Sequence, residues 1–364
     1  MIEVDAGEYA KLLHAYGRAT DTPGHLAALA GGDAAARQAA FSHLWGAIIH
    51  QGTPWTATAP VAVVVAGLVG DPRLAAGDRA NLLNFLAAVA EAGRSFGGDL
   101  GQLAPPDGYD VDAALAEVLA DPDDEDLAGI YGDEVLGNAV YARAIQDCID
   151  VVPTVLAAAI AALGDPQPEV RAAAAHAIGA SCPPGRAAEV IEQIDAAAGR
   201  AGVDARAALV LAIGDLGGAP RAYLRDPHPG VRACAALAPA LAGDPAATDE
   251  ILAALRDPAA TDDWFTHRPP QIPMRIRFSL VAAAIARVED PERLLPAALA
   301  IAPVAHIHTA RSDWGALLLA IPDGPARQRY LEALRQNEDL WDPRNGSVAL
   351  IFKQAGVPYD APRR

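Results

Sequence analysis

The chain alternates between runs of small and aliphatic residues, mainly alanine and leucine, and short polar joints rich in aspartate, glycine and proline. Alanine has the highest helix propensity because it loses no side-chain entropy in a helix. Only 5% of the residues are aromatic, so alanine and leucine supply most of the surface available for burial. The pattern predicts an all-helical protein.

The joints share one dipeptide. Asp-Pro occurs at Asp71, Asp121, Asp165, Asp226, Asp244, Asp257, Asp290 and Asp342. Most copies follow an aliphatic residue two positions earlier, which is expected to end one helix and pack inward. The aspartate then caps the next helix through its side chain, and proline takes the first helical position, where no N–H is needed. Each copy therefore predicts the junction of two helices.

Three of the joints also carry an arginine at an equivalent place. Arg171, Arg206 and Arg232 each precede an alanine-rich run, at intervals of 35 and 26 residues, and Arg37 fits the same frame near the N-terminus. Repeats of this length are typical of helical hairpins, which must stack on one another because neither helix can bury its apolar face alone.

The segment LGDPQPEVRAAA, residues 163–174, resembles the first helix of a HEAT-type repeat, and the interval of 26 residues is similar to the bilin-lyase-type variant. The resemblance implies a right-handed α-solenoid whose second helices line a concave surface. It also implies an Asp–Arg ladder between neighbouring repeats. We therefore expect Arg171 to pair with Asp165, and Arg232 with Asp226, rather than face a ligand.

The predicted organisation is one continuous solenoid in four segments. Residues 1–96 hold a capping helix and HEAT-like repeats, and 97–150 hold an irregular or degenerate repeat, or an insertion, with an acidic connector. Residues 151–260 hold the best-matching repeats, and 261–364 an irregular segment followed by further helical repeats.

Charge and cysteine content exclude several classes of protein. Acidic residues outnumber basic ones by 46 to 28, so a net charge of −18 opposes binding to nucleic acid. Three widely spaced cysteines fit neither a disulfide framework nor a zinc knuckle. Neither a signal peptide nor an apolar run long enough to span a membrane is visible. We expect a cytoplasmic protein with no membrane partner.

The stretch HQGTPWTATAP, residues 50–60, interrupts this background with polar and aromatic residues. The pattern predicts an inter-helix connector in which Gly52 ends one helix, Thr53 caps the next and Pro54 is its first residue. The connector does not need His43 and His50, which are seven residues apart and so on one helical face, or the nearby Gln51 and Trp55. They are either a polar and aromatic lining at one edge of the array or ordinary packing around the turn.

Signatures of catalysis and of cofactor binding are missing from the sequence. His306 and His308 are two positions apart, so on a helix they diverge, and no cysteine or carboxylate cluster completes a metal-ligand set. We expect no cofactor and no metal, and the sequence gives no reason to assign an enzymatic activity.

The remaining candidates are large polar or aromatic side chains set against alanine. We predict that Asn81, Asn84, Tyr141 and Asp147 face the concave side, with Trp55 at the rim; a solvated convex face is the alternative. An irregular stretch, 261–277, adds further aromatic and basic residues of the types that interfaces favour. The candidate binding residues are His50, Gln51, Trp55, Asn81, Asn84, Tyr141, Asp147, Trp264, Arg275 and Arg277.

Three functions are consistent with these features. The first is a non-enzymatic scaffold that binds a protein or peptide partner on its concave face. The second is sequestration of a small molecule or toxin, as in self-resistance or immunity proteins. The third is a HEAT-like DNA glycosylase, a class similar in repeat architecture. Such enzymes need a basic groove, and Arg268, Arg275 and Arg277 form the only local basic cluster near a tryptophan.

Overall fold

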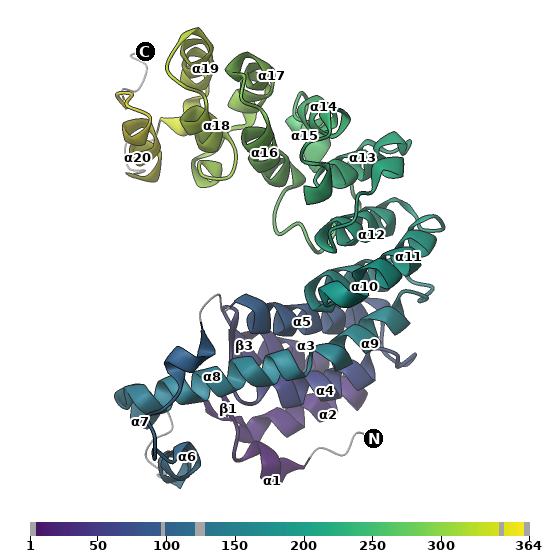
Figure 1. Cartoon of the computed structure of the whole chain (residues 1–364), viewed down its shortest axis with the longest axis vertical. Coiled ribbons are helices and arrows are strands. Elements are labelled where there is room, and N and C mark those ends of the chain that lie inside the picture. The colour runs from purple at the N-terminus through teal and green to yellow at the C-terminus, as the bar shows by residue number, and fades with distance from the viewer. Residues whose placement is uncertain (1–4, 96–98, 121–127, 342–345, 360–364) are drawn as a thin grey trace. The chain divides into compact units, whose positions relative to one another are not determined.

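The computed structural model describes residues 5–95, 99–120, 128–341 and 346–359, and within them it is an all-α helical repeat solenoid, as predicted (Figure 1). Its only strands in these ranges are four two-residue segments paired in two small hairpins. Contacts divide the chain into two compact units, Met1–Arg186 and Ala187–Arg364, here called unit 1 and unit 2. The four-segment division remains a prediction.

Unit 1 contains ten α-helices and two hairpins within its described residues. The helices are α1 (Ala6–Tyr9), α2 (Thr22–Gly31), α3 (Ala34–His43), α4 (Thr58–Leu68), α5 (Ala76–Ser95), α6 (Val111–Ala120), α7 (Ala128–Gly132), α8 (Glu134–Asp150), α9 (Val152–Ala162) and α10 (Pro168–Ser181). The strands are β1 (Leu13–His14), β2 (Gly17–Arg18), β3 (Ile49–His50) and β4 (Thr53–Pro54).

Three helical pairs form the stack of unit 1: α2 with α3, α4 with α5, and α9 with α10. Helix α4 contacts both α2 and α9, and α5 lies beside α10 (Figure 1). The consecutive residues Leu82 and Leu83, and likewise Phe85 and Leu86, are fully buried, so α5 is covered on most of its sides. Helices α6, α7 and α8 are inserted between the second and third pairs, and α8 packs on α5 and α4.

The stretch HQGTPWTATAP does not form the predicted connector. Its first five residues form the β3–β4 hairpin, in which His50 pairs with Thr53 and Gln51 and Gly52 make the turn. Both turn residues have positive φ, +52° and +84°, as a two-residue hairpin loop of type I′ requires. The prediction that Thr53 caps a helix was therefore wrong, because the next helix begins only at Thr58.

Unit 2 contains ten α-helices in the described part of the chain. They are α11 (Ala187–Ala198), α12 (Val203–Asp215), α13 (Pro229–Ala236), α14 (Pro245–Ala254), α15 (Pro258–Asp262), α16 (Ile276–Arg287), α17 (Pro291–Ile301), α18 (Trp314–Ala320), α19 (Pro325–Arg335) and α20 (Gly346–Gln354). From α11 to α14 each helix contacts the next, and further along the chain alternate helices also contact each other, such as α14 with α16 and α17 with α19. One core in this unit includes the fully buried Trp314 and Tyr330.

The Asp-Pro joints act in two ways. Asp244, Asp257 and Asp290 cap α14, α15 and α17 as predicted. At Asp165 and Asp226 the prediction was wrong.

Each of these two aspartates accepts a hydrogen bond from the N–H two residues later, and the helix starts one residue after that. The reason is a second proline in Asp-Pro-x-Pro, which takes the first helical position itself. Asp71 forms the same turn without starting a helix, and Asp121 and Asp342 lie outside the described residues.

The arginines are anchored differently from the predicted pairing. Arg171 donates to the backbone carbonyl oxygens of Asp165, at 2.6 Å, and Pro166, at 3.0 Å, and the carboxylate of Asp165 pairs with Arg79. Because α5 and α10 are neighbours, this ion pair joins adjacent helical pairs across the insertion. The prediction that Arg171 and the Asp165 carboxylate form an ion pair was wrong.

The same arrangement occurs in unit 2. Arg232 donates to the backbone carbonyl of Asp226 at 3.0 Å and to the carboxylate of Glu250 at 2.9 Å. The carboxylate of Asp226 instead pairs with Arg206 of the preceding repeat, with 2.9 Å between Nη1 and Oδ2. An Asp–Arg ladder therefore exists between repeats, but each aspartate binds the arginine of the neighbouring repeat rather than its own.

One segment, Glu134–Ala162, is apolar and long enough to cross a membrane by composition alone. It consists of α8 and α9, which meet near Pro153 and pack on α4 and α5. Core helices of soluble proteins satisfy the same criterion. In this segment Leu136, Val140 and Ile145 are buried, and 39% of its most apolar window is buried inside the protein.

Candidate functional site

A cavity of about 550 Å³ lies between the β3–β4 hairpin, α7 and α8 in unit 1. Its volume falls in the range of pockets that hold small ligands or anchoring side chains. Three aromatic side chains and two carboxylates are among its lining residues. The lining is Thr53, Pro54, Trp55, Ile130, Tyr131, Asp133, Glu134, Gly137, Asn138, Val140, Tyr141 and Ala144.

One face of α8 forms a wall of this cavity. Glu134, Asn138 and Tyr141 are four and three residues apart, so they project from the same side of the helix. Gly137 lies on that side too, and a Cβ atom there would sit 3.1 Å from the carbonyl oxygen of Ile130. Glycine therefore allows α7 to approach α8 closely at the base of the wall.

Asp133 fixes the start of that wall. Its Oδ1 caps α8 by accepting hydrogen bonds from the N–H groups of Val135 and Leu136, and its Oδ2 accepts one from the Tyr109 hydroxyl at 2.7 Å. The backbone N–H of Leu136 and the Tyr109 hydroxyl lower the pKa of Asp133 below its usual value. This carboxylate is therefore charged at neutral pH and held in place.

Trp55 forms the opposite wall. Its ring meets that of Tyr131 edge to face, with 6.4 Å between the ring centroids. The indole Nε1 is buried and has no hydrogen-bond partner among the residues that the structure describes. Buried indole N–H groups normally have an acceptor, so this donor is unsatisfied among the described residues.

Trp55 and Tyr141 are the two predicted site residues that line the cavity. His50 lies in the adjacent hairpin and donates through Nδ1 to the Gly46 carbonyl at 2.8 Å, and Gln51 is an exposed turn residue. Asn81 accepts a hydrogen bond from Trp45 Nε1 at 3.0 Å.

Two more predicted residues stand outside the lining of this cavity. Asn84 has a buried Oδ1 with no partner among the described residues. Asp147 is half-buried, and burial raises the pKa of its carboxyl group. The common binding surface predicted for these residues remains a prediction.

The basic cluster of unit 2 is engaged within the protein. Arg277, 4% exposed, pairs with Asp262 and with the fully buried Asp313. Arg275 is 53% exposed and pairs with the same Asp262 at 2.6 Å. Trp264 packs partly against the core of unit 2. These contacts make the cluster a structural ion-pair network, in which burial raises the pKa of Asp313.

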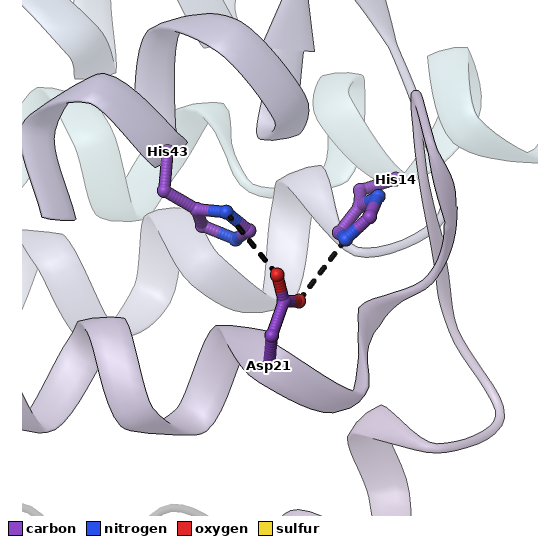
Figure 2. A group of neighbouring side chains, drawn as sticks. All are labelled: His14, Asp21 and His43. Carbon is purple, nitrogen blue, oxygen red and sulfur yellow. Dashed lines mark hydrogen bonds and ion pairs between the residues drawn. The ribbon is translucent and has the colours of Figure 1, made fainter. Parts of the chain in front are cut away.

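A second polar cluster in unit 1 consists of His14, Asp21 and His43 (Figure 2). His14 ends β1, Asp21 immediately precedes α2 and His43 is the last residue of α3. His14 Nε2 lies 3.0 Å from Asp21 Oδ1, and His43 Nδ1 lies 3.7 Å from Asp21 Oδ2. Both histidine side chains are buried, whereas that of Asp21 is half exposed.

Hydrogen bonds hold both rings in place. The Tyr16 N–H donates to His14 Nδ1 at 3.1 Å, and the buried Thr22 hydroxyl lies 2.9 Å from His43 Nε2. Burial lowers the pKa of His43 to about 4, and the nearby His25 and His14 act in the same direction, so this ring is neutral at physiological pH. Burial opposes ionisation of Asp21, but His43 and His14 lower its pKa on balance.

Sequence reasoning missed this cluster, and it missed Tyr131, Asp133 and Glu134 in the cavity. The region before residue 20 was predicted to be a capping helix, whereas the β1–β2 hairpin turns His14 back toward Asp21. One signal was available, because four of the nine histidines fall within residues 14–50.

The family model for the HEAT repeat matches residues 155–183, which cover most of α9 and all of α10. This stretch contains Asp165 and Arg171, the residues on which the resemblance was based. No curated protein and no solved structure gives a significant match to the chain. The match identifies a HEAT repeat in unit 1, and such repeats generally form helical scaffolds for protein interactions.

Proposed function

We propose that this protein is a non-enzymatic HEAT-repeat scaffold that binds a protein or peptide partner, and that the cavity beside Trp55 is its principal contact. The observation that carries the proposal is the gathering of Trp55, Tyr131 and Tyr141 around one cavity in a chain with few aromatic residues. Tryptophan and tyrosine are enriched at the energetic centres of protein interfaces, where they fill or form well-packed pockets.

The cavity also supplies the polar features of a peptide site. Asp133 and Glu134 would attract a basic or N–H-bearing group of the partner. The walls are fixed by the cap of α8 and by the Gly137 contact, so little ordering free energy is spent on forming them. These features support a preformed anchor site for one side chain of a partner.

The finer assignment to bilin-lyase-type repeats rests on the interval of 26 residues between Arg206 and Arg232 and is part of the proposal. A DNA glycosylase function has less support. Arg275 and Arg277 are neutralised by Asp262 and Asp313, and Arg268 donates to the carbonyl oxygen of Met274. A nucleic-acid groove requires cations that are free to contact phosphates.

Affinity capture from the cells of origin, after cross-linking, tests the proposal. The wild-type chain is compared with Tyr131→Ala and with Tyr16→Ala. The two tyrosines are 68% and 63% exposed and lie in the same unit, but only Tyr131 lines the cavity. We expect one enriched partner that Tyr16→Ala retains and Tyr131→Ala loses. Equal capture by both variants, or no enriched partner, contradicts the proposal.

A second candidate function is sequestration of a small molecule. The cavity volume of about 550 Å³ favours it, because ligands of drug size occupy cavities of this magnitude. Titration of tryptophan fluorescence with a metabolite extract tests this function, with Trp55→Phe as the variant that lacks the relevant indole. Quenching in the wild type but not in Trp55→Phe supports sequestration, and a flat response in the wild type excludes it.

A further inference from the structure

We propose that His14, Asp21 and His43 form a binding site for one divalent transition-metal ion of the Zn²⁺ type. One ligand atom from each residue lies within 4.8 Å of the others (Figure 2). The three residues come from β1, from the turn before α2 and from the end of α3, so the fold itself brings them together. The site is separate from the aromatic cavity, and its test does not depend on the proposed function.

The spacing of the ligand atoms suits a small tetrahedral ion. Bonds of about 2.0–2.2 Å from Zn²⁺ to nitrogen and oxygen place neighbouring ligand atoms roughly 3.3–3.5 Å apart. The two observed separations, 3.0 Å for His14 to Asp21 and 3.7 Å for His43 to Asp21, lie on either side of this range. The two histidine ligand atoms lie within 4.8 Å of each other, so metal binding would also draw these two rings closer together.

The ligand types select the class of ion. Two imidazoles and one carboxylate suit Zn²⁺ and other divalent transition metals, whereas Ca²⁺ and Mg²⁺ prefer oxygen ligands. Three protein ligands leave one position of a tetrahedron open. Water can fill this position. The half-exposed Asp21 gives the ion a route from solvent.

The contacts behind the ligands differ between the two histidines. Thr22 holds His43 Nε2 at 2.9 Å, which leaves Nδ1 directed toward Asp21, as expected for an oriented metal ligand. His14 Nδ1 instead accepts the Tyr16 N–H, so Nε2 carries the proton in the metal-free protein.

Metal binding through His14 Nε2 must move that proton to Nδ1, which displaces the Tyr16 N–H. Tyr16 lies in the exposed turn of the β1–β2 hairpin, where water can accept this N–H. Binding of the ion should therefore rearrange this turn, and the amide resonance of Tyr16 reports the change.

The test is calorimetric titration of tag-free, chelator-treated full-length protein with Zn²⁺, alongside Mg²⁺. We expect one Zn²⁺ per chain, a higher melting temperature with Zn²⁺ than with Mg²⁺, and a shift of the Tyr16 amide resonance. Asp21→Asn keeps the shape of the side chain but should weaken Zn²⁺ binding by about tenfold or more. His176→Gln is the matched control, because His176 forms a histidine–carboxylate pair with Glu91 elsewhere in unit 1.

Visible absorption of Co²⁺ bound to the wild type gives a second readout that needs no variant. Intense d–d bands indicate a tetrahedral site with nitrogen and oxygen ligands. The proposal is overturned if the wild type shows no saturable binding of Zn²⁺ or Co²⁺. It is equally overturned if Asp21→Asn, with an unchanged circular dichroism spectrum, binds Zn²⁺ as tightly as His176→Gln.

Discussion

At the scale of single residues, burial decides what an ion pair contributes. Arg275 and Arg277 both pair with Asp262, but Arg275 is half exposed and Arg277 is buried with Asp313. Exposed pairs contribute about 0–1 kcal/mol, whereas removal of one partner from a buried pair costs about 3–5 kcal/mol. We predict that Arg277→Met lowers the free energy of unfolding by the larger amount and Arg275→Met by the smaller, as measured by urea denaturation. Equal effects would contradict this account.

The same network predicts a dependence on pH. Burial raises the pKa of Asp313 above its unfolded value, so the folded state binds this proton more tightly than the unfolded state does. The free energy of unfolding contributed by Asp313 therefore rises as the pH falls through the raised pKa. In the Arg277→Met variant the Asp313 carboxylate loses its arginine partner, so its protonation at low pH should stabilise the folded state more than in the wild type. The stability deficit of Arg277→Met should thus shrink between neutral pH and about pH 4, and a constant deficit would exclude the mechanism.

Residue identity alone located part of the cavity. Trp55 and Tyr141 stood out because large aromatic side chains are rare in this chain, and both line the cavity. Tyr131, Asp133 and Glu134 were missed because an acidic connector resembles a solvated loop in sequence. Their role depends on the packing of α7 on α8, which Gly137 permits and no short pattern reveals.

At the scale of elements, the hairpin at Gln51 and Gly52 replaces a predicted helical connector. The sequence Gly-Thr-Pro has the residues of a helix start, but α4 begins only at Thr58 and has no side-chain cap. The Thr58 hydroxyl instead accepts the Trp55 N–H at 2.8 Å and donates to the Ile48 carbonyl at 2.7 Å. These contacts are formed between segments on both sides of the turn, so local propensity could not identify them. The helices themselves were predictable because alanine-rich runs favour no other structure.

The hairpin makes a testable prediction about glycine. Gly52 has φ of +84°, a conformation that costs an L-residue about 1–2 kcal/mol. Gly52→Ala should therefore lower the melting temperature of the protein. Gly70→Ala is the control, because a Cβ atom there meets nothing within 4 Å and its φ lies outside the left-handed region. If both variants have the same melting temperature as the wild type, the type I′ turn is not formed.

The Asp–Arg ladder gives a second prediction at this scale. Arg206→Ala leaves the buried carboxylate of Asp226 without its arginine, which should cost about 2–3 kcal/mol. Arg171→Ala removes only hydrogen bonds to two carbonyl groups and should cost about 1 kcal/mol. Chemical denaturation of the two variants measures the difference. A larger loss of unfolding free energy in Arg171→Ala than in Arg206→Ala would contradict this account and support the Arg171–Asp165 ion pair predicted from the sequence.

At the scale of the whole molecule, the repeat pattern predicted the fold class but not the way in which the chain builds each unit. The match to a HEAT repeat covers residues 155–183, and the stack of unit 1 continues from α5 to α10 across an insertion. Sequence spacing could not show this, because Arg79 and Asp165 are 86 residues apart and only the fold makes them neighbours. The insertion that breaks the periodicity also supplies most of the aromatic cavity.

The central claim is that this cavity binds a polypeptide, and site-specific photo-cross-linking in the cells of origin tests it most directly. A photoreactive phenylalanine analogue is placed at position 131 in the cavity or, as the control, at the similarly exposed position 16. We predict a discrete protein adduct at position 131 that Trp55→Ala abolishes, and none at position 16. Adducts of equal yield at both positions, or an adduct only with a small molecule, would contradict the claim.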